Sequence, residues 1–564
     1  MIQEFGAAPV KAVEVSQGPL WLAAAPGNLM RAQGRFLAVE GYLPDIAGLE
    51  EPNPAEPWDG HHCLAYADAE NQKLVLLRDL SGGEHLFYSR RGGLLLFSNS
   101  LRPLLAHRDC PRRLNTDVLA EYLFNGAVTW GDETLFEGIR ELPPGHGITI
   151  SRGEWRAHAP PSPYLEEPRR SPEATPARLR RLLFDATAKA IGDDTQAAVS
   201  LSGGIDSATI AALAAEVLGP RNVTAFIYEF AEPGHPSETD LSVLTARRLG
   251  IRHHLVRISI EDHLEALPEA CRHAENGRVN WNPSRLFFLK RVAREGFTKL
   301  LTGDGIELVL GLLSFGPFLR DFARAIPWTP FLDAALTARL PPLLKYVLPA
   351  RMAGPIPREI LGPVFRVLRH NGLIKDMRRF YPAPLSSLLR RFEDSPRVSE
   401  ALRAHSALPL SAQLMQACFY SFVMPRMLAN KAALARGAGV SLVAPALFQG
   451  CASMSAAFAH ETRGCFRHVH IEAMAGVLPE EVLHRPKIVG QGVSPVSWSG
   501  KIIQRVESLT GGMAGLKPLF SPAEFEAARA NFAYPLAESA MMSLLFLEEP
   551  LRPEASGRAR RAAP

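Results

Sequence analysis

Six consecutive residues, Ser202-Gly203-Gly204-Ile205-Asp206-Ser207, have the composition of a phosphate-binding loop. Glycines let a backbone approach phosphate oxygens closely, and a helix beginning after them would point N–H groups and the positive end of its dipole at the anion. The hydroxyls of Ser202 and Ser207 can donate hydrogen bonds, and Asp206 can hold Mg²⁺, which prefers oxygen ligands and substrate phosphates. Because the Lys of a Walker A loop is missing, these residues predict a phosphate and Mg²⁺ site of a different kind, and a tight strand-to-helix turn is the alternative.

The flanking residues predict the elements that position this loop. Residues 197–201 indicate a short buried strand before it, and residues 207–218 indicate a helix after it. Further strands are expected at 223–228, 254–258 and 298–301, with a helix at 237–249. Strands that alternate with helices favour an α/β fold with a parallel sheet and crossover helices.

The first part of the chain has a different pattern. Residues 74–77 and 94–97 are apolar runs bounded by Ser81-Gly82-Gly83 and Arg91-Gly92-Gly93, which favours short antiparallel strands. The proline-rich stretch 158–176 is typical of a linker. At its end, Thr175-Pro176 predicts a helix start with Thr as N-cap.

Composition excludes several classes of protein. Apolar residues make up 47 % and charged residues 21 % of the 564 residues, as in globular proteins, and a net charge of +4 gives no indication of nucleic acid binding. The six cysteines form no C-x-x-C pair, so neither a zinc site nor a disulfide framework is indicated. No signal peptide or uncharged span of 18 residues is apparent, and we expect a cytoplasmic protein without a membrane span.

The loop resembles the PP-loop of ATP pyrophosphatases, S-G-G-x-D-S, and the resemblance extends to the asparagine-synthetase superfamily over nearly the whole chain. Residues 78–88, which begin Arg78-Asp79, are similar to that family's R-D-x-x-G-x-x-P-L-Y-Y. Residues 134–146 are similar to T-x-F-x-G-I-x-x-L-P-P-G-H. The resemblance implies a ligase that activates a carboxylate as an acyl-adenylate.

The same resemblance implies site residues. Glu238 falls where the family has a glutamate lining the nucleotide site, although a solvated helix-start carboxylate is the alternative. Residues 301–307 resemble L-S-G-E-G-x-D, which places Asp304 at a catalytic position and Glu307 at the second Mg²⁺ carboxylate. Residues 478–487 resemble L-P-x-x-v-x-x-R-x-K, whose Lys stabilises the adenylate and the acyl-transfer transition state; here it is Lys487, with a surface Lys as the alternative. The expected nucleotide-binding set is Leu201, Ser202, Gly203, Gly204, Asp206, Ser207, Glu238 and Gly303, the metal ligands are Asp206 and Glu307, and the catalytic residues are Lys487 and Asp304.

The implied organisation has two domains. Residues 1–157 would form a degenerate glutaminase-like domain of the Ntn-hydrolase α+β type. Residues 158–176 would form a linker and residues 177–550 a doubly wound parallel-sheet synthetase domain with helical additions. Residues 551–564 would be a disordered tail.

Two departures from the family pattern suggest a changed substrate. Glutamine-hydrolysing members begin, after Met removal, with a nucleophilic Cys, whereas Ile2 stands here and the first Cys is Cys63. The family's K-x-D-R and G-L-E-x-R-x-P are replaced at 431–434 and 439–445, where charged residues are lost. A pocket lined by Ser441 and Val443 would suit a larger, less charged acyl group than aspartate.

Among the relatives, lasso peptide cyclases fit these departures best. They join an Asp or Glu side chain of a precursor peptide to its N-terminal amine, and we expect a leader-peptide-binding protein and a leader peptidase as partners. Small-molecule amide synthetases, including β-lactam and ammonia-dependent asparagine-forming enzymes, remain alternatives, as do a non-catalytic scaffold and, less consistent with the charge, a tRNA-modifying enzyme. The aromatic residues of 308–348 would form either a wall for the threaded tail or ordinary helix-packing core.

Overall fold

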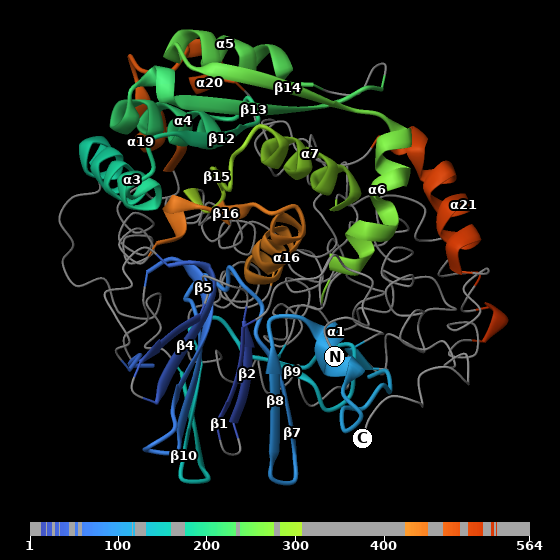
Figure 1. Ribbon diagram of the computed structural model, residues 1–564. Helices are drawn as coiled ribbons and strands as arrows, with labels where there is room; N and C mark the ends of the chain where they lie inside the picture. The colour runs from blue at the N-terminus through green and yellow to red at the C-terminus, as the bar shows by residue number, and fades with distance from the viewer. Residues whose placement is uncertain are drawn as a thin grey trace, which may run out of the picture.

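The structure is a computed structural model that describes the two predicted regions and leaves several segments out. The described residues are 13–17, 20–24, 29–32, 34–43, 51–54, 59–115, 117–118, 131–159, 175–232, 237–273, 275, 282–306, 423–448, 466–485, 495–510, 521–523 and 526. Figure 1 shows strands of the N-terminal region in the lower half and a second sheet, flanked by helices, in the upper half.

Antiparallel strands form the N-terminal domain. A six-stranded sheet has the order β11-β10-β6-β5-β4-β3, and a three-stranded sheet has the order β8-β7-β9. The strands of these sheets are β3 (Leu29–Ala32), β4 (Arg35–Tyr42), β5 (His61–Asp68), β6 (Lys73–Arg78), β7 (Phe87–Arg91), β8 (Leu94–Ser98), β9 (Arg140–Glu141), β10 (Gly147–Ser151) and β11 (Glu154–His158). A hairpin of β1 (Val13–Gln17) and β2 (Leu20–Ala24) is separate, and the short helix α1 (Leu101–Ala106) contacts β7 and β8.

The two sheets of this domain share a hydrophobic core. One buried cluster contains Cys63, Ala65 and Leu76 of the larger sheet. Two side chains of the smaller sheet, Tyr88 and Phe97, pack onto the same cluster. Alternate residues of a strand point to opposite faces, which is why Leu64 and Leu77 belong to a different cluster. The strands predicted at 74–77 and 94–97 are confirmed, each with slightly wider bounds.

The second domain is built on a parallel sheet. Its strand order is β14-β13-β12-β15-β16, and every neighbouring pair is parallel. The strands are β12 (Ala197–Leu201), β13 (Val223–Phe230), β14 (Arg252–Ile258), β15 (Lys299–Leu301) and β16 (Ser441–Val443). The chain runs outward from β12 to β14 and then returns to the other side of β12, so the order reverses between β12 and β15. In such doubly wound sheets, ligands bind at the carboxyl ends of the strands at this switch point.

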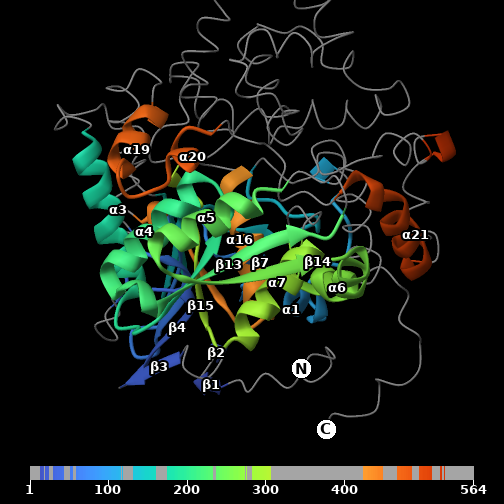
Figure 2. The ribbon, with the colours of Figure 1, turned by 90° about the horizontal axis from the view of Figure 1, so that it is seen from above.

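Helices cover both faces of the parallel sheet, which confirms the α/β prediction (Figures 1 and 2). On one face lie α3 (Pro176–Ile191), α4 (Ile205–Leu218), α5 (Thr239–Leu249), α19 (Phe466–Met474) and α20 (Glu480–Leu483). On the other lie α6 (Ile260–His273), α7 (Asn282–Arg294) and α16 (Val423–Gly437). The remaining described helices are α21 (Ser499–Thr510) and the 3-10 turns Pro220–Asn222, Pro445–Leu447 and Val496–Trp498. No described helix is long and apolar enough to cross a membrane.

The start of α3 is set by its sequence. Thr175 is the N-cap, and its hydroxyl accepts a hydrogen bond from the N–H of Arg178 at 3.2 Å. Pro176 follows in the first turn, where its missing N–H costs nothing. This helix start was predicted from the same two residues. The structure does not test the predicted domain boundaries, and most of the predicted linker and the tail at 551–564 lie outside the described residues.

Strand β16 contradicts one expectation. The side chain of Val443 is 0 % exposed and belongs to the core cluster of the synthetase domain, so it does not line a substrate pocket as predicted. The parallel pairing of β16 with β15 explains this, because an inward-facing residue of a sheet strand is buried under the covering helices. Ser441 is half-buried.

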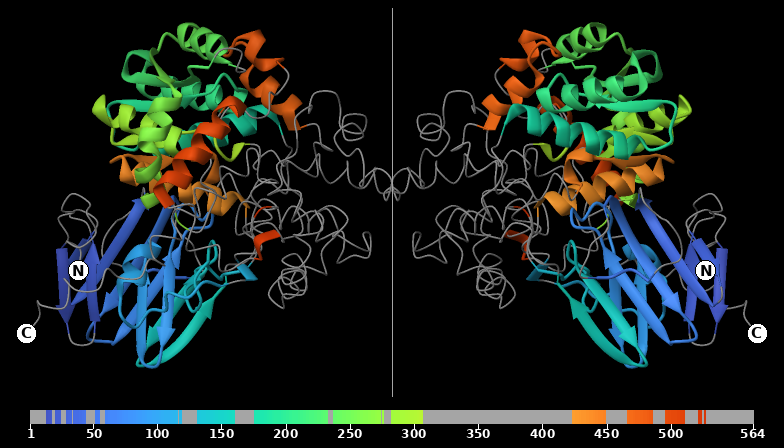
Figure 3. Two further views of the ribbon diagram at one scale, coloured as in Figure 1. Left: turned by 90° about the vertical axis from the view of Figure 1, so that its right-hand side faces the viewer. Right: turned by 90° about the vertical axis from the view of Figure 1, so that its left-hand side faces the viewer.

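Helix α16 lies between the two domains (Figure 3), and buried polar contacts join the domains through it. Glu141 of the N-terminal domain contacts Arg78 at 2.9 Å, His85 at 2.7 Å and Arg426 of α16 at 3.4 Å. Glu141 is 2 % exposed, and burial alone would raise its pKa, but the nearby Arg78, the hydrogen-bonded His85 and Arg426 outweigh burial and hold that pKa well below the ordinary range.

Candidate active site

The predicted phosphate-binding loop closes on itself after β12. The N–H of Ser202 donates to Oγ of Ser207 at 3.0 Å, and that hydroxyl donates in turn to the carbonyl of Gly204 at 3.1 Å. Gly203 adopts a φ of +74°, in the left-handed region that favours glycine. A side chain at Gly203 would also collide with Glu238, because its Cβ would lie 2.7 Å from the Glu238 carbonyl oxygen.

Helix α4 begins at the end of the loop and offers an anion-binding terminus. Its N-cap is Gly204, which supplies no side-chain cap for the N–H groups of the first turn. These N–H groups and the positive end of the dipole of a 14-residue helix can hold phosphate oxygens. Asp206 lies in the same first turn with its side chain 27 % exposed. Leu201, also predicted to bind nucleotide, has a buried side chain, so only its backbone could contribute.

The loop after β15 packs directly on the phosphate-binding loop. A Cβ on Gly303 would lie 2.6 Å from the backbone nitrogen of Ser207 and from the backbone carbon of Asp206. The absence of a side chain at Gly303 therefore permits the two loops to touch. Because β15 is the hydrogen-bonded neighbour of β12, the predicted residues 202–207 and 303–304 meet at the switch point.

Asp304 is held by a lysine from α16. Lys431 Nζ lies 2.7 Å from Oδ1 of Asp304, and the hydroxyl of Thr302 donates to Oδ2 at 3.1 Å. Burial raises the pKa of Asp304, but the Lys431 ammonium outweighs burial and leaves that pKa below its usual value. The pKa of Lys431 is lowered, because burial and the nearby Arg285 outweigh the attraction of Asp304. The site thus keeps an ionised carboxylate beside an amine of reduced basicity.

Glu238 pairs with an arginine on the other side of the loop. It is the N-cap residue of α5, is 6 % exposed and forms an ion pair with Arg485. This pairing shows that Glu238 is not the solvated helix-start carboxylate that the sequence left as an alternative. Burial lowers the pKa of Arg485, and the negative charge of Asp206 partly opposes that shift. The Arg485 guanidinium also lies 3.6 Å from the place that a Cβ on Gly204 would occupy.

Asp206 has a buried neighbour on α19. Nδ1 of His470 lies 3.5 Å from Oδ1 of Asp206, and Nε2 of His470 lies 2.8 Å from the hydroxyl of Thr209. This histidine is 1 % exposed.

The structure brings together seven of the predicted site residues, namely Ser202, Gly203, Gly204, Asp206, Ser207, Gly303 and Glu238, with Asp304 beside them. Glu307 and Lys487 lie outside the described residues, so their predicted roles stay predictions. Sequence reasoning missed Lys431, Arg485 and His470. Arg485 stands inside the motif at 478–487 and Lys431 inside the segment that departs from the family pattern, but no sequence signal marks His470.

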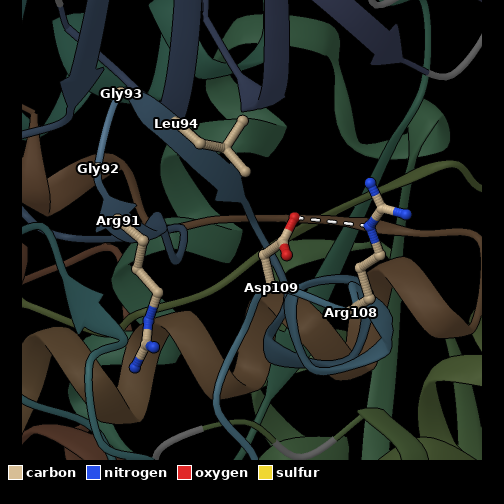
Figure 4. Close-up of a pocket in the computed structure, with 6 residues that line it drawn as sticks. All are labelled: Arg91, Gly92, Gly93, Leu94, Arg108 and Asp109. Atoms are coloured by element: carbon tan, nitrogen blue, oxygen red, sulfur yellow. Dashed lines mark ion pairs between the residues drawn. The ribbon is translucent and has the colours of Figure 1, made fainter.

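A hollow in the N-terminal domain is not part of this site. It is lined by Arg91, Gly92, Gly93, Leu94, Arg108 and Asp109 (Figure 4). Arg108 and Asp109, which are consecutive in the chain, form a 3.7 Å ion pair in this lining. The hollow lies at the turn of the β7–β8 hairpin, whereas residues 202–207 follow β12 in the other domain.

Comparison with known families agrees with this geometry. The model of the asparagine synthase family matches residues 178–528, which is more than half of the chain. The chain belongs to the asparagine synthase family. A glutamine amidotransferase domain model also matches residues 53–163. The motifs that suggested the resemblance thus lie in regions that the two family models cover.

Individual relatives are distant. The amidase chyE of Penicillium rubens is 28 % identical over 267 residues, which is 44 % of this chain and 39 % of the amidase. An asparagine synthetase [glutamine-hydrolyzing] 3 of Bacillus subtilis is 27 % identical over 287 residues, which is 48 % of this chain and 46 % of the synthetase. The match therefore spans less than half of the length of these two relatives. An NH3-dependent NAD synthetase of Campylobacter jejuni aligns over 39 % of this chain and 95 % of its own, at 17 % identity and a TM-score of 0.19, and adds nothing to the assignment.

Proposed function

We propose that this chain is an ATP-dependent, AMP-forming carbon–nitrogen ligase. The observation that carries this proposal is the meeting of a phosphate-binding loop, residues 202–207, with the Asp304–Lys431 pair at the switch point of a parallel sheet. Membership of the asparagine synthase family supports the same reaction class.

The loop is suited to bind the phosphates of ATP. The N–H groups at the start of α4 and the hydroxyls of Ser202 and Ser207 would hold phosphate oxygens. Asp206, together with Glu307, would hold Mg²⁺, which neutralises phosphate charge when bound. Proteins bind Mg²⁺ through one or two carboxylates plus substrate phosphates, which is the set of ligands proposed here.

The reaction has two balanced steps. The substrate carboxylate attacks the α-phosphorus of ATP, so that an acyl–O–P bond forms and pyrophosphate leaves. An amine then attacks the acyl carbon, the amide bond forms, AMP leaves and the amine loses a proton. Asp304, kept ionised by Lys431, would accept that proton, and Lys487 would stabilise the charge that develops on the acyl group.

Product analysis tests the reaction class. Incubation with ATP, Mg²⁺ and a competent acyl substrate should release AMP and pyrophosphate, and Asp206→Ala should abolish both. Release of ADP and phosphate instead would refute adenylation.

The finer proposal is that the substrate is a peptide and that the product is a macrolactam between an Asp or Glu side chain and the N-terminal amine, as in lasso peptides. Two features support it. The segment 431–445 lacks charged residues that the family uses in its substrate pocket. In addition, the described cysteines are buried, and burial raises the pKa of the Cys63 thiol, so none of them is suited to attack glutamine.

The partners follow from the physics of peptide closure. Ordering a free peptide costs about 1–2 kcal/mol per residue in backbone entropy. A leader-peptide-binding protein would raise the effective concentration of the precursor, and a leader peptidase would expose its N-terminal amine. The wall expected from the aromatic residues of 308–348 lies outside the described residues.

A direct competition separates this proposal from its alternatives. A precursor core peptide with an Asp or Glu acceptor should lose one water in mass in an ATP-dependent manner. If aspartate plus ammonium yielded asparagine instead, the chain would be an ammonia-dependent synthetase, an activity equally consistent with the names of its relatives. A β-lactam-forming enzyme would instead cyclise a small β-amino acid. If no acyl substrate supported ATP–pyrophosphate exchange, the non-catalytic scaffold would be favoured.

A further inference from the structure

The histidine of α19 joins two side chains of α4. Nε2 of His470 lies 2.8 Å from Oγ1 of Thr209, and its Nδ1 lies 3.5 Å from Oδ1 of Asp206. Asp206 and Thr209 are three residues apart on α4, so they share one face of the helix. The imidazole therefore spans one turn of the helix that carries the predicted metal ligand.

The position of this imidazole is fixed by packing. His470 is 1 % exposed, and α19 packs against α3. Met474, at the end of α19, belongs to the core cluster that also contains α4 residues such as Ile210. A buried side chain on a packed helix cannot move away from Asp206 without disturbing this core.

The Asp206 carboxylate and the Thr209 hydroxyl together favour one tautomer of His470. A neutral imidazole has one N–H donor and one acceptor nitrogen. If the Thr209 hydroxyl donates to Nε2, then Nδ1 carries the proton and presents an N–H to the carboxylate of Asp206. The opposite tautomer would place a nitrogen lone pair against a carboxylate oxygen, which is repulsive. The contacts therefore favour the Nδ1–H form.

We propose that His470 is a positioning residue that orients the Asp206 carboxylate for nucleotide-bound Mg²⁺, with Thr209 holding its Nε2. This inference rests on the proposed function. Residues that orient a metal ligand typically contribute a factor of roughly 10–100 to metal affinity. No motif of the sequence marks this role, because it arises from a contact between two helices, and the contacting residues Thr209 and His470 are 261 positions apart in the chain.

Two substitutions of His470 distinguish the contribution of its Nδ1 from that of its Nε2. The amide nitrogen of Asn in His470→Asn takes the place of Nδ1, whereas that of Gln in His470→Gln takes the place of Nε2. The assay is ATP binding to the full chain by titration calorimetry, across a range of Mg²⁺ concentrations and again in EDTA. His470→Gln should raise the Mg²⁺ concentration for half-maximal ATP binding about tenfold or more, with ATP affinity in EDTA within about twofold of the unsubstituted chain. His470→Asn should stay within about threefold.

The control is His468→Gln, because the side chain of His468 on the same helix is 72 % exposed. Equal Mg²⁺ dependence in the Asn and Gln variants, or a parallel loss of affinity in EDTA, would overturn the positioning role. If the His470 variants do not fold, Thr209→Val provides a second test, because it keeps the side-chain shape and removes the hydroxyl. It should shift the Mg²⁺ dependence of ATP binding in the same direction as His470→Gln. An unchanged Mg²⁺ dependence would overturn the inference. Failure of the unsubstituted chain to bind ATP with Mg²⁺ would instead refute the proposed function.

Discussion

Glu275, between α6 and α7, places a buried carboxylate at the contact between the two domains. Its Oε1 accepts a hydrogen bond from the Ser100 hydroxyl at 2.6 Å, and its Oε2 accepts one from the N–H of Leu101 at 2.9 Å. Ser100 is the N-cap residue of α1 but makes no side-chain cap of its own, so Glu275 caps α1 from the other domain. Burial raises the pKa of Glu275 from 4.5 to about 7, although these hydrogen bonds and Arg102 oppose the shift.

The sign of the pH dependence follows from this shift. A carboxyl group whose pKa is raised by folding contributes stability that is complete below the unfolded pKa of 4.5 and is lost as the pH rises through about 7. At about 1.4 kcal/mol per pH unit, the difference corresponds to about 3 kcal/mol. The unsubstituted chain therefore loses this stability between about pH 5 and pH 8.

Glu275→Gln should remove this loss while keeping both hydrogen bonds. The amide oxygen of Gln can accept from Leu101, and its NH₂ group can donate to the Ser100 hydroxyl, which is also an acceptor. The variant should melt at about the same temperature as the unsubstituted chain at pH 5 and roughly 2–3 °C above it at pH 8.5. Thermal unfolding at both pH values measures the effect, with the exposed Glu154→Gln as a control. A variant that is less stable at pH 8.5, or a difference that does not change with pH, would refute the reasoning.

Three further substitutions test the site and the interface. Gly303→Ala should weaken ATP·Mg²⁺ binding about tenfold or more, since overpacking the contact between the two loops costs about 1–3 kcal/mol. The control is Gly500→Ala, whose added Cβ meets no atom within 4 Å and which should bind ATP·Mg²⁺ normally in the same titration. Lys431→Met should slow amide formation about tenfold or more, because it leaves Asp304 without its cation, and should leave ATP affinity unchanged. Lys431→Arg should recover part of the rate. Equal rates of product formation in Lys431→Met and the unsubstituted chain would contradict the role of the pair. Glu141→Gln should cost about 3 kcal/mol by leaving buried arginines without their anion, and an unchanged melting temperature would contradict it.

The local elements could be predicted because their signals are local. The helix start at Thr175-Pro176, the strand at 197–201 and the glycine turn after it each depend on a few adjacent residues. The observed strands and helices differ from the predicted bounds by about two residues at their ends, which is the usual uncertainty of helix ends. The family resemblance, and no local signal, assigned residues 202–207 and Asp304 to one site, and the structure shows the loops after β12 and β15 in contact.

The long-range contacts could not be predicted from the residues. Lys431 follows Asp304 by 127 positions, and Thr209 precedes His470 by 261, so nothing in either neighbourhood indicates the partner. The error at Val443 has the same origin. Its position in the replaced family motif suggested that the side chain lines a substrate pocket. The pairing of β16 with β15 instead buries this side chain in the core.

The contact of His61 with the end of β16 bears on how the two domains could be separated. β16 is the last strand in the order of the parallel sheet, and Nε2 of His61 lies 3.0 Å from both the N–H and the carbonyl of Ala444 just beyond it. An uncovered edge strand is a template for pairing with another chain. The synthetase domain produced alone would expose this edge and the buried charges of α16. Self-association, rather than a stable half-protein, is therefore the expected fate of the isolated domain.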